Sequence, residues 1–470
     1  IKLNIRNKLS NIKLFNTNHS NKRTQTNTNE HKRTQTPLLI STFSKQSKMA
    51  LNMARSKHEL SKGGYTLMEH QVDALKWMIK RETTISRTSK KPIKGPFGGI
   101  LADDMGLGKT LEVISLILSK PISDTIIIVP ANLINQWIGE FNKFAPHIKI
   151  TKNIEEHTTD TVLVVSYIKA VRSSYIVEKN WTRIVLDEAH YIRNPKGSVH
   201  KKMIRIKSQF KWCLTGTPIQ NYIKDVYSLL SFIGIEQSKI THSSTAATTN
   251  ALKTTLEKYL LRRTKKGLNF DLPSISYETN SVEYKSEKEK TLYKKMSDDF
   301  MGIEIHILES LLRMRQAALL PQMVYDGYGK KMKKTFVWKH SNSKLDAIVD
   351  KLEEKPEDKP IIFCYFTKEI EYISEKLSQK EISYKIINGG VSMDQRSTII
   401  EESDSYRVII IQMMAGSTGL NLQAFNSVYF SGPHWNPTHE QQAIARVYRI
   451  GQTKPVTIRR FIMKDTIEEL

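Results

Sequence analysis

Apolar residues in this chain gather in short runs that alternate with stretches of helical periodicity. Thr125–Val129 and Val162–Tyr167 are runs of this kind, too short for a buried helix and typical of strands. After the first of them, residues Ala131–Phe144 place Leu133 and Trp137 at helical spacing. Strands that are apolar throughout are buried on both faces, so the pattern predicts a parallel sheet with helices on each side.

The same alternation resumes in the last third of the chain. Strands are expected at 360–366, 384–387, 408–413, 427–430 and 456–461, with helices at 344–353, 368–379, 392–402 and 438–448. Residues 222–345 are predominantly helical and highly charged, and Leu260–Lys265 is expected to be a positively charged helix end. The prediction is an α/β protein with two doubly wound parallel sheets and helical protrusions between them.

The charge balance points to a polyanionic partner. The 470 residues carry a net charge of +25, of which nine charges lie on residues 1–48. That segment is rich in Asn, Thr, Ser and Lys, and Met49 is the first methionine. Residues 1–48 are therefore expected to be a disordered basic tail or non-native upstream sequence. The remaining charge favours nucleic acid over a membrane surface.

Cysteine usage and hydropathy indicate an intracellular protein without a membrane anchor. Cys213 and Cys364 lie far apart in apolar runs, which predicts two buried, reduced thiols. No apolar run approaches the length that crosses a bilayer.

The strongest candidate for chemistry is a glycine-rich loop between an apolar run and a helical stretch. Gly106 and Gly108 would let backbone N–H groups approach phosphates. Lys109 would neutralise the terminal phosphates of a nucleotide, and the Thr110 hydroxyl would hold Mg²⁺. The general phosphate-loop pattern has glycine where this chain has Asp103, so a turn that only caps a helix is the alternative reading.

A second motif supports the prediction of a nucleotide-binding site. Asp187 and Glu188 end an apolar run that lies 78 positions after Lys109, and ligands bind at the carboxyl ends of parallel strands. Asp187 would hold the metal through its shell, and Glu188 would orient and deprotonate the attacking water. A solvated acidic turn is the alternative.

Two further segments are suited to reading the nucleotide. The Gln71 amide could contact the edge of an adenine ring while Tyr65 or Leu67 covers its face. Thr215 and Thr217 follow another strand run and could report the nucleotide state to the other half of the chain. Capping the next helix is an equally good role for these threonines.

Taken together, the motifs resemble those of the Swi/Snf-type ATPases, which are double-stranded-DNA translocases of helicase superfamily two. The resemblance covers roughly residues 64–470. The motifs that carry it, in family order, are Leu67–Gln71, Ile100–Thr110, Asp187–His190, Leu214–Asn221, Leu261–Arg263, Ala415–Leu422, Trp435–Pro437 and Gln441–Gln452. Asp104 and the Arg449–Gln452 ending are particular to this family among related motors.

The resemblance implies two RecA-like lobes with ATP and Mg²⁺ between them. The implied domains are lobe 1 at 49–275, a helical protrusion or linker at 276–341, and lobe 2 at 342–470. Arg446 and Arg449, three apart on one expected helix face, would act as arginine fingers from lobe 2.

The resemblance also assigns residues to binding and coupling. ATP contacts are expected at Tyr65, Leu67, Gln71, Asp104, Met105, Gly106, Leu107, Gly108, Lys109, Thr110 and Gly419, with Thr110 and Asp187 on the metal. Duplex DNA contacts are expected at Asn132, Ser166, Asn388, Gly389, Gly390, Ser417 and Trp435. Coupling between the sites is expected at Thr215, Gly216, Thr217 and Gln220.

The interpretation is an ATP-dependent translocase on double-stranded DNA that remodels protein–DNA complexes, with nucleosomes or other DNA-bound proteins as partners. It would act inside the cell wherever that DNA lies: a nucleus or a viral replication compartment. One alternative is a strand-separating DNA or RNA helicase, since Asp187–His190 also occurs in such enzymes. The other is a truncated, non-catalytic DNA-binding scaffold.

Overall fold

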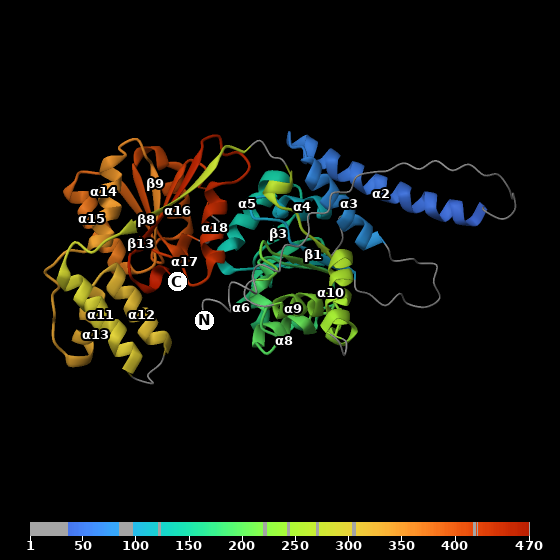
Figure 1. Cartoon of the computed structure of the whole chain (residues 1–470). Helices are drawn as coiled ribbons and strands as arrows, with labels where there is room; N and C mark the ends of the chain where they lie inside the picture. Colours follow the sequence, from blue (N-terminus) through green and yellow to red (C-terminus); the bar gives the residue numbers. More distant parts are fainter. Residues whose placement is uncertain are drawn as a thin grey trace, which may run out of the picture. The chain divides into compact units, whose positions relative to one another are not determined.

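The computed structural model describes residues 36–83, 97–120, 124–219, 223–241, 245–268, 272–302, 307–416, 420 and 422–469. These residues belong to two compact units, and the chain passes from the first to the second after Phe270 (Figure 1). Each unit is built on one sheet, and every strand pair in both sheets is parallel. The predicted α/β class with two parallel sheets is confirmed.

The first unit has a seven-stranded sheet in the order β3-β4-β2-β5-β6-β1-β7. Its strands are β1 (Gly98–Leu101), β2 (Thr125–Val129), β3 (Ile150–Thr151), β4 (Val162–Ser166), β5 (Trp181–Leu186), β6 (Ser208–Leu214) and β7 (Leu260–Leu261). Its helices are α2 (Thr36–Lys62), α3 (Glu69–Thr83), α4 (Lys109–Ser119), α5 (Ile134–Phe144), α6 (Tyr167–Arg172), α7 (Ser174–Glu178), α8 (Ser198–Arg205), α9 (Lys224–Phe232) and α10 (Thr245–Tyr259). Four 3₁₀ turns join them: η1 (Ala131–Leu133), η2 (Ala189–Ile192), η3 (Gln237–Lys239) and η4 (Lys265–Leu268).

The two faces of this sheet bury two separate cores, as alternating side chains require. Ile127 and Val185 pack with helices α2 to α5, whereas Ile126 and Ile184 pack with helices α6 to α10. Figure 1 shows α3, α4 and α5 on one side of the sheet and α8 and α9 on the other. The continuous apolar strands of the sequence therefore reflect burial on both faces.

The second unit has a six-stranded sheet in the order β10-β11-β9-β12-β13-β8. Its strands are β8 (Ile275–Val282), β9 (Pro360–Cys364), β10 (Tyr384–Ile387), β11 (Val408–Gln412), β12 (Ser427–Phe430) and β13 (Val456–Met463). Its helices are α11 (Glu287–Gly302), α12 (Ile307–Leu319), α13 (Gln322–Met332), α14 (Ser343–Glu354), α15 (Thr367–Gln379), α16 (Met393–Glu401), α17 (Met413–Gly416) and α18 (Pro437–Val447), with 3₁₀ turns η5 (Ser403–Ser405) and η6 (Ile467–Glu469).

This sheet also separates two cores. Helices α11 to α15 pack against Ile362 and Tyr429 on one face, and α17 and α18 pack against Ile361 and Phe430 on the other. Cys364 of this unit and Cys213 of the first are buried free thiols, as predicted.

The segment expected to begin a helical linker at residue 276 instead begins with a strand. Strand β8 pairs with β13 along its whole length, from Ile275 opposite Val456 to Val282 opposite Met463. It lies at the edge of the sheet, where most of its side chains are only partly covered. An edge strand lacks the continuous apolar pattern that identifies a central strand, so β8 was not predictable from its hydrophobic pattern.

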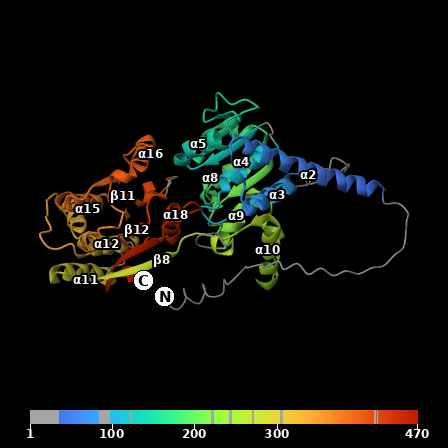
Figure 2. The ribbon, with the colours of Figure 1, turned by 90° about the horizontal axis from the view of Figure 1, so that it is seen from above.

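The folded part also begins earlier than the sequence analysis expected. Helix α2 starts at Thr36 and lies beside α3 and α4 (Figures 1 and 2). Met49, Met53 and Leu60 recur at helical spacing and pack into the core of the first unit. The expectation of a disordered tail is therefore wrong for residues 36–48, which form the first part of α2.

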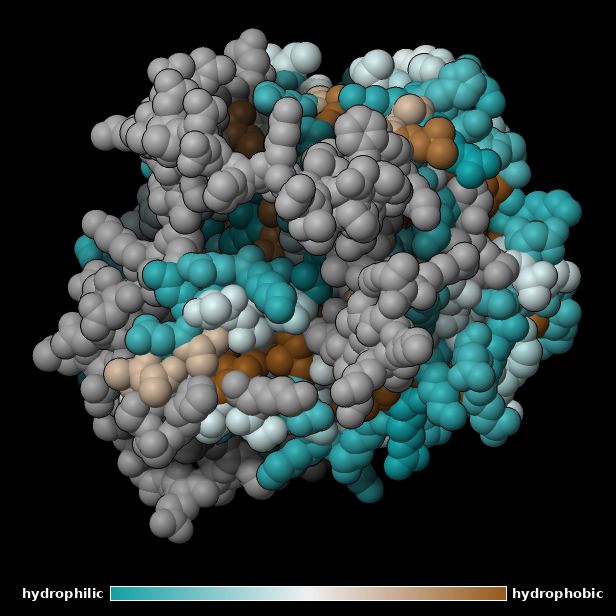
Figure 3. Space-filling view, turned by 90° about the vertical axis from the view of Figure 1, so that its right-hand side faces the viewer, coloured by the Kyte–Doolittle hydropathy of each residue, from teal (hydrophilic) through white to brown (hydrophobic). Residues whose placement is uncertain are grey.

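None of the described helices is long and apolar enough to cross a membrane. The coloured atoms on the face drawn in Figure 3 are mostly hydrophilic, and the hydrophobic ones form small separate patches.

Candidate functional site

One edge of the first sheet collects most of the residues predicted to act. Strands β4, β2, β5, β6 and β1 are neighbours in that order and run parallel, so their carboxyl ends lie at the same edge. Along that edge stand Ser166 at the end of β4, Asn132 after β2, Asp187 and Glu188 after β5, Thr215, Gly216 and Thr217 after β6, and residues 103–110 after β1. Such an edge is where open α/β sheets bind ligands.

The loop after β1 has the backbone that close approach to phosphates requires. Gly106 and Gly108 both have positive φ, 85° and 87°, which non-glycine residues rarely adopt. A Cβ on Gly108 would also lie 2.4 Å from the Gln71 amide nitrogen. Helix α4 begins directly after Gly108, so its amino-terminal N–H groups open onto the loop.

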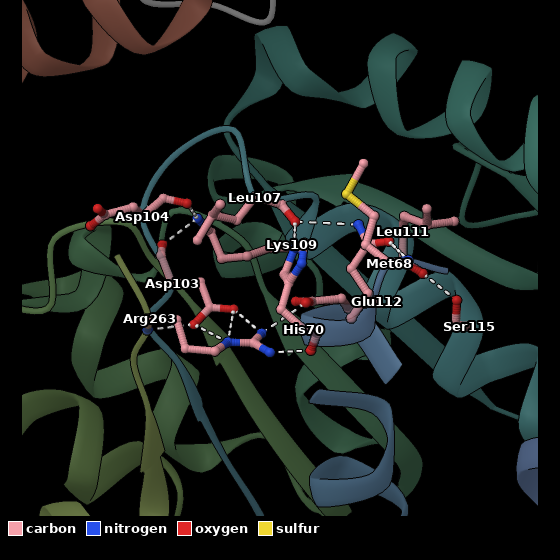
Figure 4. Close-up of polar contacts among 11 residues, drawn as sticks. Met68, His70, Asp103, Asp104, Leu107, Lys109, Leu111, Glu112, Ser115 and Arg263 are labelled. Carbon is pink, nitrogen blue, oxygen red and sulfur yellow. Dashed lines mark hydrogen bonds and ion pairs between the residues drawn. The ribbon is translucent and has the colours of Figure 1, made fainter. Parts of the chain in front are cut away.

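The ammonium group of Lys109 is held by the loop itself. Its Nζ donates to the carbonyl oxygens of Asp103 and Asp104 at 2.7 and 3.2 Å (Figure 4). This places a positive charge inside the turn, where a terminal phosphate would meet it. The loop therefore fits the phosphate chain of a nucleotide.

Behind the loop lies a buried charged cluster that sequence reasoning missed. Arg263 donates through Nε to both carboxylate oxygens of Asp103 at 3.0 and 3.1 Å and through Nη2 to Glu112 at 2.9 Å. It also donates to the His70 carbonyl oxygen (Figure 4). Asp103 and Glu112 are fully buried. Burial and the neighbouring Asp103 charge raise the pKa of Glu112 to about 8, and Arg263 opposes this rise.

The position of Arg263 corrects the sequence analysis, which placed Leu260–Lys265 at a helix end. Helix α10 stops at Tyr259, and Leu260 and Leu261 form β7, which pairs with β1. Because β7 runs beside β1, the two arginines that follow β7 lie next to the phosphate loop that follows β1. Arg262 donates to the carbonyl oxygens of Ala102 and Gly216 at 2.9 and 3.1 Å.

The phosphate loop and the loop after β6, where coupling residues are predicted, lie against each other. A Cβ on Gly216 would lie 2.6 Å from Cγ of Met105, so a side chain at this position would displace Met105. Thr215 accepts a hydrogen bond from the backbone N–H of Thr217 through Oγ1 at 3.1 Å. The threonines thus shape their own turn. Gln220 lies outside the described residues.

The predicted adenine-binding residues lie next to the phosphate loop. The Gln71 amide donates to the Leu107 carbonyl oxygen at 3.3 Å and accepts from the Met68 N–H at 3.0 Å. Tyr65 and Leu67 are partly buried against the α2–α5 core. Gln71 therefore ties its own segment to the loop, and its contact with adenine stays a prediction.

The acid pair after β5 is tightly held. Burial and the adjacent Glu188 charge raise the pKa of Asp187 to about 6, whereas a hydrogen bond from Trp137 and the charge of Lys109 lower it. Glu188 has a left-handed backbone, with φ 47° and ψ 50°, a strained conformation that occurs often at functional sites. Its carboxylate lies 3.2 Å from Nδ1 of His190.

The donors at this edge fit Mg²⁺ held mainly by a substrate. Asp187 is a partly buried carboxylate, and Thr110 lies in the first turn of α4. Mg²⁺ prefers a few protein oxygens together with phosphates and water. The described residues contain no cluster of three or more His, Cys, Asp or Glu suited to a metal ion.

In the second unit, the two predicted arginine fingers do not share a helix. Arg446 lies in α18, which ends at Val447, so Arg449 stands in the turn that follows. The turn continues through Gly451, with φ 96°, a conformation that glycine adopts without strain. The expectation of one helix face is wrong for Arg449.

The buried side chain of Gln452 holds the turn that follows α18 in place. Gln452 donates to the carbonyl oxygens of Gln423, Phe425 and Val447 at 2.9 to 3.2 Å. The side-chain oxygen of Gln452 accepts a hydrogen bond from the Thr453 N–H at 2.9 Å. Gln452 therefore fixes the turn that carries Arg449.

The predicted DNA contacts of the second unit also lie at a carboxyl edge. Asn388, Gly389 and Gly390 follow β10, and Arg396 donates to the Asn388 carbonyl oxygen at 2.8 Å. Trp435 follows β12 and is 54% exposed. Ser417 and Gly419 lie outside the described residues.

Trp435 rests on a buried arginine that the sequence analysis did not single out. The Arg315 guanidinium lies 4.8 Å from the Trp435 ring centroid and 5.1 Å from that of Tyr365. It donates to the Pro433 carbonyl oxygen at 2.7 Å. Cation–π contact thus presents the indole to solvent.

Two parallel α/β units, one with a glycine-rich loop and an acid pair at the carboxyl edge of its sheet, have the architecture of a helicase-like ATPase. Comparison with protein families gives the particular class. The SNF2-related domain model matches residues 70–323, and the helicase conserved C-terminal domain model matches residues 343–451. The chain belongs to the SNF2-related family.

Curated relatives are 24% to 31% identical to this chain over the aligned residues. An uncharacterized ATP-dependent helicase of Mycoplasma genitalium is 31% identical over 86% of this chain, which spans 40% of that protein's length. A probable global transactivator of Orgyia pseudotsugata multicapsid polyhedrosis virus is 27% identical over 86% of both chains.

Among solved structures, the Sulfolobus solfataricus SWI2/SNF2 ATPase core in complex with dsDNA is similar to this chain. The two share 25% sequence identity, the match covers 86% of this chain and 89% of that one, and the TM-score is 0.42.

Proposed function

We propose that this chain is an ATP- and Mg²⁺-dependent motor that double-stranded DNA stimulates and that moves along DNA to remodel protein–DNA complexes. The observation that carries the proposal is the edge of the first sheet, where the Ser166 and Asn132 loops, the acid pair and the phosphate loop follow strand after neighbouring strand. Membership of the SNF2-related family and relatives named as ATP-dependent helicases support it.

In this proposal each residue of the ATP site has a separate task. Lys109 binds the terminal phosphates, with the N–H groups at the start of α4 beside it. Glu188 orients the attacking water and accepts its proton. Thr110 and Asp187 would hold Mg²⁺, which would neutralise charge on the phosphate oxygens. Arg446 and Arg449 supply positive charge from the second unit.

The DNA contacts in this proposal are made with phosphates rather than with bases. Helix starts and small polar turns, such as Ser166 at α6 and Asn388–Gly390, bind phosphates without reading sequence. The net charge of +25 favours such binding. The partners would be duplex DNA and the proteins bound to it, wherever in the cell that DNA lies.

Steady-state ATP hydrolysis by the full chain tests the proposal. Reactions would contain no nucleic acid, duplex DNA, single-stranded DNA or duplex RNA, with Glu188→Gln as the blank. We expect strong stimulation by duplex DNA and a loss of roughly 10²–10⁴-fold in the variant, because the general base is gone.

The other outcomes separate the alternatives. Stimulation chiefly by RNA or single strands, with unwinding of a fluorophore–quencher duplex, would favour a strand-separating helicase. DNA binding without hydrolysis would favour a non-catalytic scaffold. A short third strand displaced from a triplex would report translocation.

A further inference from the structure

Two buried aromatic side chains donate hydrogen bonds to Asp187, and neither belongs to the motifs that predict the ATP site. The indole Nε1 of Trp137 donates to Oδ2 of Asp187 at 2.8 Å. The hydroxyl of Tyr167 donates to the backbone carbonyl oxygen of Asp187 at 2.8 Å. The carboxylate and the backbone of one residue are thus held by two different helices.

Each of these helices begins at a loop assigned to DNA. Trp137 lies in α5, which starts at Ile134 directly after the η1 turn that contains Asn132. Tyr167 is the first residue of α6, and Ser166 caps that helix by accepting a hydrogen bond from the Lys169 N–H at 3.1 Å. A displacement of either loop therefore moves a donor of Asp187.

The surroundings leave both donors little freedom to move independently. Trp137 is 1% exposed and packs against Phe141 within the core. The Tyr167 ring stacks on Tyr191 with 5.0 Å between centroids and 6° between planes. Tyr191 lies in η2, directly after the acid pair, and is 51% exposed. Tightly packed groups transmit a shift rather than absorb it.

Other buried indoles of this unit bond elsewhere. Trp181 donates to the Ile176 carbonyl oxygen at 2.9 Å, and Trp212 donates to Glu82 at 3.0 Å. A buried tryptophan in this unit therefore does not necessarily form a hydrogen bond with the acid pair. The indole of Trp137 instead donates to Asp187, 50 positions away along the chain.

We infer that Trp137 and Tyr167 are positioning residues that couple duplex DNA binding to ATP hydrolysis. When DNA phosphates bind at the Asn132 and Ser166 loops, the starts of α5 and α6 shift, and the two donors set Asp187 and the adjoining Glu188 for reaction. The inference rests on the proposed function and deepens it, because it names how the DNA-binding edge regulates the ATP site.

Trp137→Phe and Tyr167→Phe test the inference, since each keeps an aromatic ring and removes one donor. The readout is the ratio of the DNA-stimulated to the basal rate of hydrolysis, measured with ATP KM and duplex DNA affinity. We expect the ratio to fall about tenfold in each variant, while KM and DNA affinity stay within about twofold. A loss confined to the ratio is not what general destabilisation produces.

Matched controls come from the chain itself. Trp181→Phe removes an indole donor bonded to Ile176, and Tyr429→Phe removes a buried hydroxyl bonded to Asp358 at 3.1 Å in the second unit. Both should keep the wild-type ratio. Thermal unfolding of all four variants shows whether they fold.

The outcomes separate the two proposals. A DNA-stimulated wild type whose ratio is unchanged in Trp137→Phe and Tyr167→Phe overturns the coupling role alone. Equal losses of basal and stimulated rates also overturn it, because they indicate a structural role. A wild type that DNA does not stimulate overturns the proposed function, and the coupling role with it.

Discussion

The two units share one architecture, but two of their buried charged clusters lie in different places. In the first unit, Arg263 lies between two buried carboxylates, Asp103 and Glu112, directly behind the phosphate loop. In the second unit, buried Lys344 pairs with Glu468 at 2.5 Å and joins α14 to the η6 turn. The first cluster shapes a ligand site, whereas the second fastens elements of the fold to one another. Parallel sheets with helices on both faces can therefore serve different purposes, and the charged groups at their edges decide which.

Arg263→Met should have the largest effect and should affect both fold and ligand. Removing the guanidinium leaves the buried Asp103 carboxylate without its arginine partner, which costs about 3–5 kcal/mol. Because Asp103 begins the phosphate loop, ATP affinity should also fall by roughly tenfold or more. Equilibrium binding of a fluorescent ATP analogue and hydrogen exchange of α4 amides would measure the two effects.

Arg263→Lys is the matched control, because it keeps the charge and loses the planar fork that contacts both Asp103 and Glu112. It should recover part of the stability and part of the affinity. Unchanged nucleotide affinity in Arg263→Met would mean that the cluster is only structural, and the contrast between the units would disappear.

Lys344→Met should destabilise the second unit comparably, by about 3–5 kcal/mol, and leave ATP affinity unchanged. Stability should fall because buried Glu468 would lose the ammonium group with which it pairs. ATP affinity should stay because the pair lies far along the sequence from the phosphate loop. Hydrogen exchange of α14 and β13 amides would report the loss.

The double variant Lys344→Met/Glu468→Gln sharpens this test. It removes both charges, so most of the stability should return. A double variant as unstable as Lys344→Met would show that the packing of the lysine stem, not the charge pair, is what matters.

The ATP site was predictable from sequence where its residues are close along the chain. The phosphate loop and Asp187–Glu188 each lie at the end of an apolar run, so a local pattern placed them at the carboxyl edge of a sheet. Arg263 reaches Asp103 across 160 positions, and Trp137 reaches Asp187 across 50. Contacts of that kind depend on strand order, which apolar patterns do not specify.

The fold was predictable to a similar degree, and its prediction failed at some elements for a related reason. Central strands such as β2 and β9 are apolar throughout, and the sequence located them closely. Edge strands β7 and β8 bury less, so they carried no such pattern. Helix α18 was expected, but it ends at Val447, whose carbonyl oxygen accepts a hydrogen bond from Gln452.

The smallest effect concerns Glu369, a fully buried carboxyl at the start of α15. Its Oε2 accepts from the backbone N–H groups of Tyr365 and Phe366 at 2.8 and 3.1 Å. Burial raises its pKa, whereas these hydrogen bonds, a bond with Ser431 and the charge of Lys344 oppose the rise. Because the net direction is upward, the folded state holds this proton more tightly than the unfolded chain does.

Glu369→Gln should therefore change how the second unit responds to pH. With a raised pKa, the stabilising contribution of Glu369 is complete below the ordinary pKa of a glutamate and is lost as pH rises through the folded-state pKa. Glutamine resembles the protonated acid and also serves in a capping box, so variant and wild type should agree within roughly 1 kcal/mol at low pH. As pH rises, the variant should gain stability relative to the wild type. Hydrogen exchange of α15 and β9 amides across this range would measure the difference, with exposed Glu371→Gln on the same helix as the control. A difference in stability that stayed constant with pH would show that Glu369 does not change its protonation on unfolding in this range. Its contribution would then come from packing and hydrogen bonds alone.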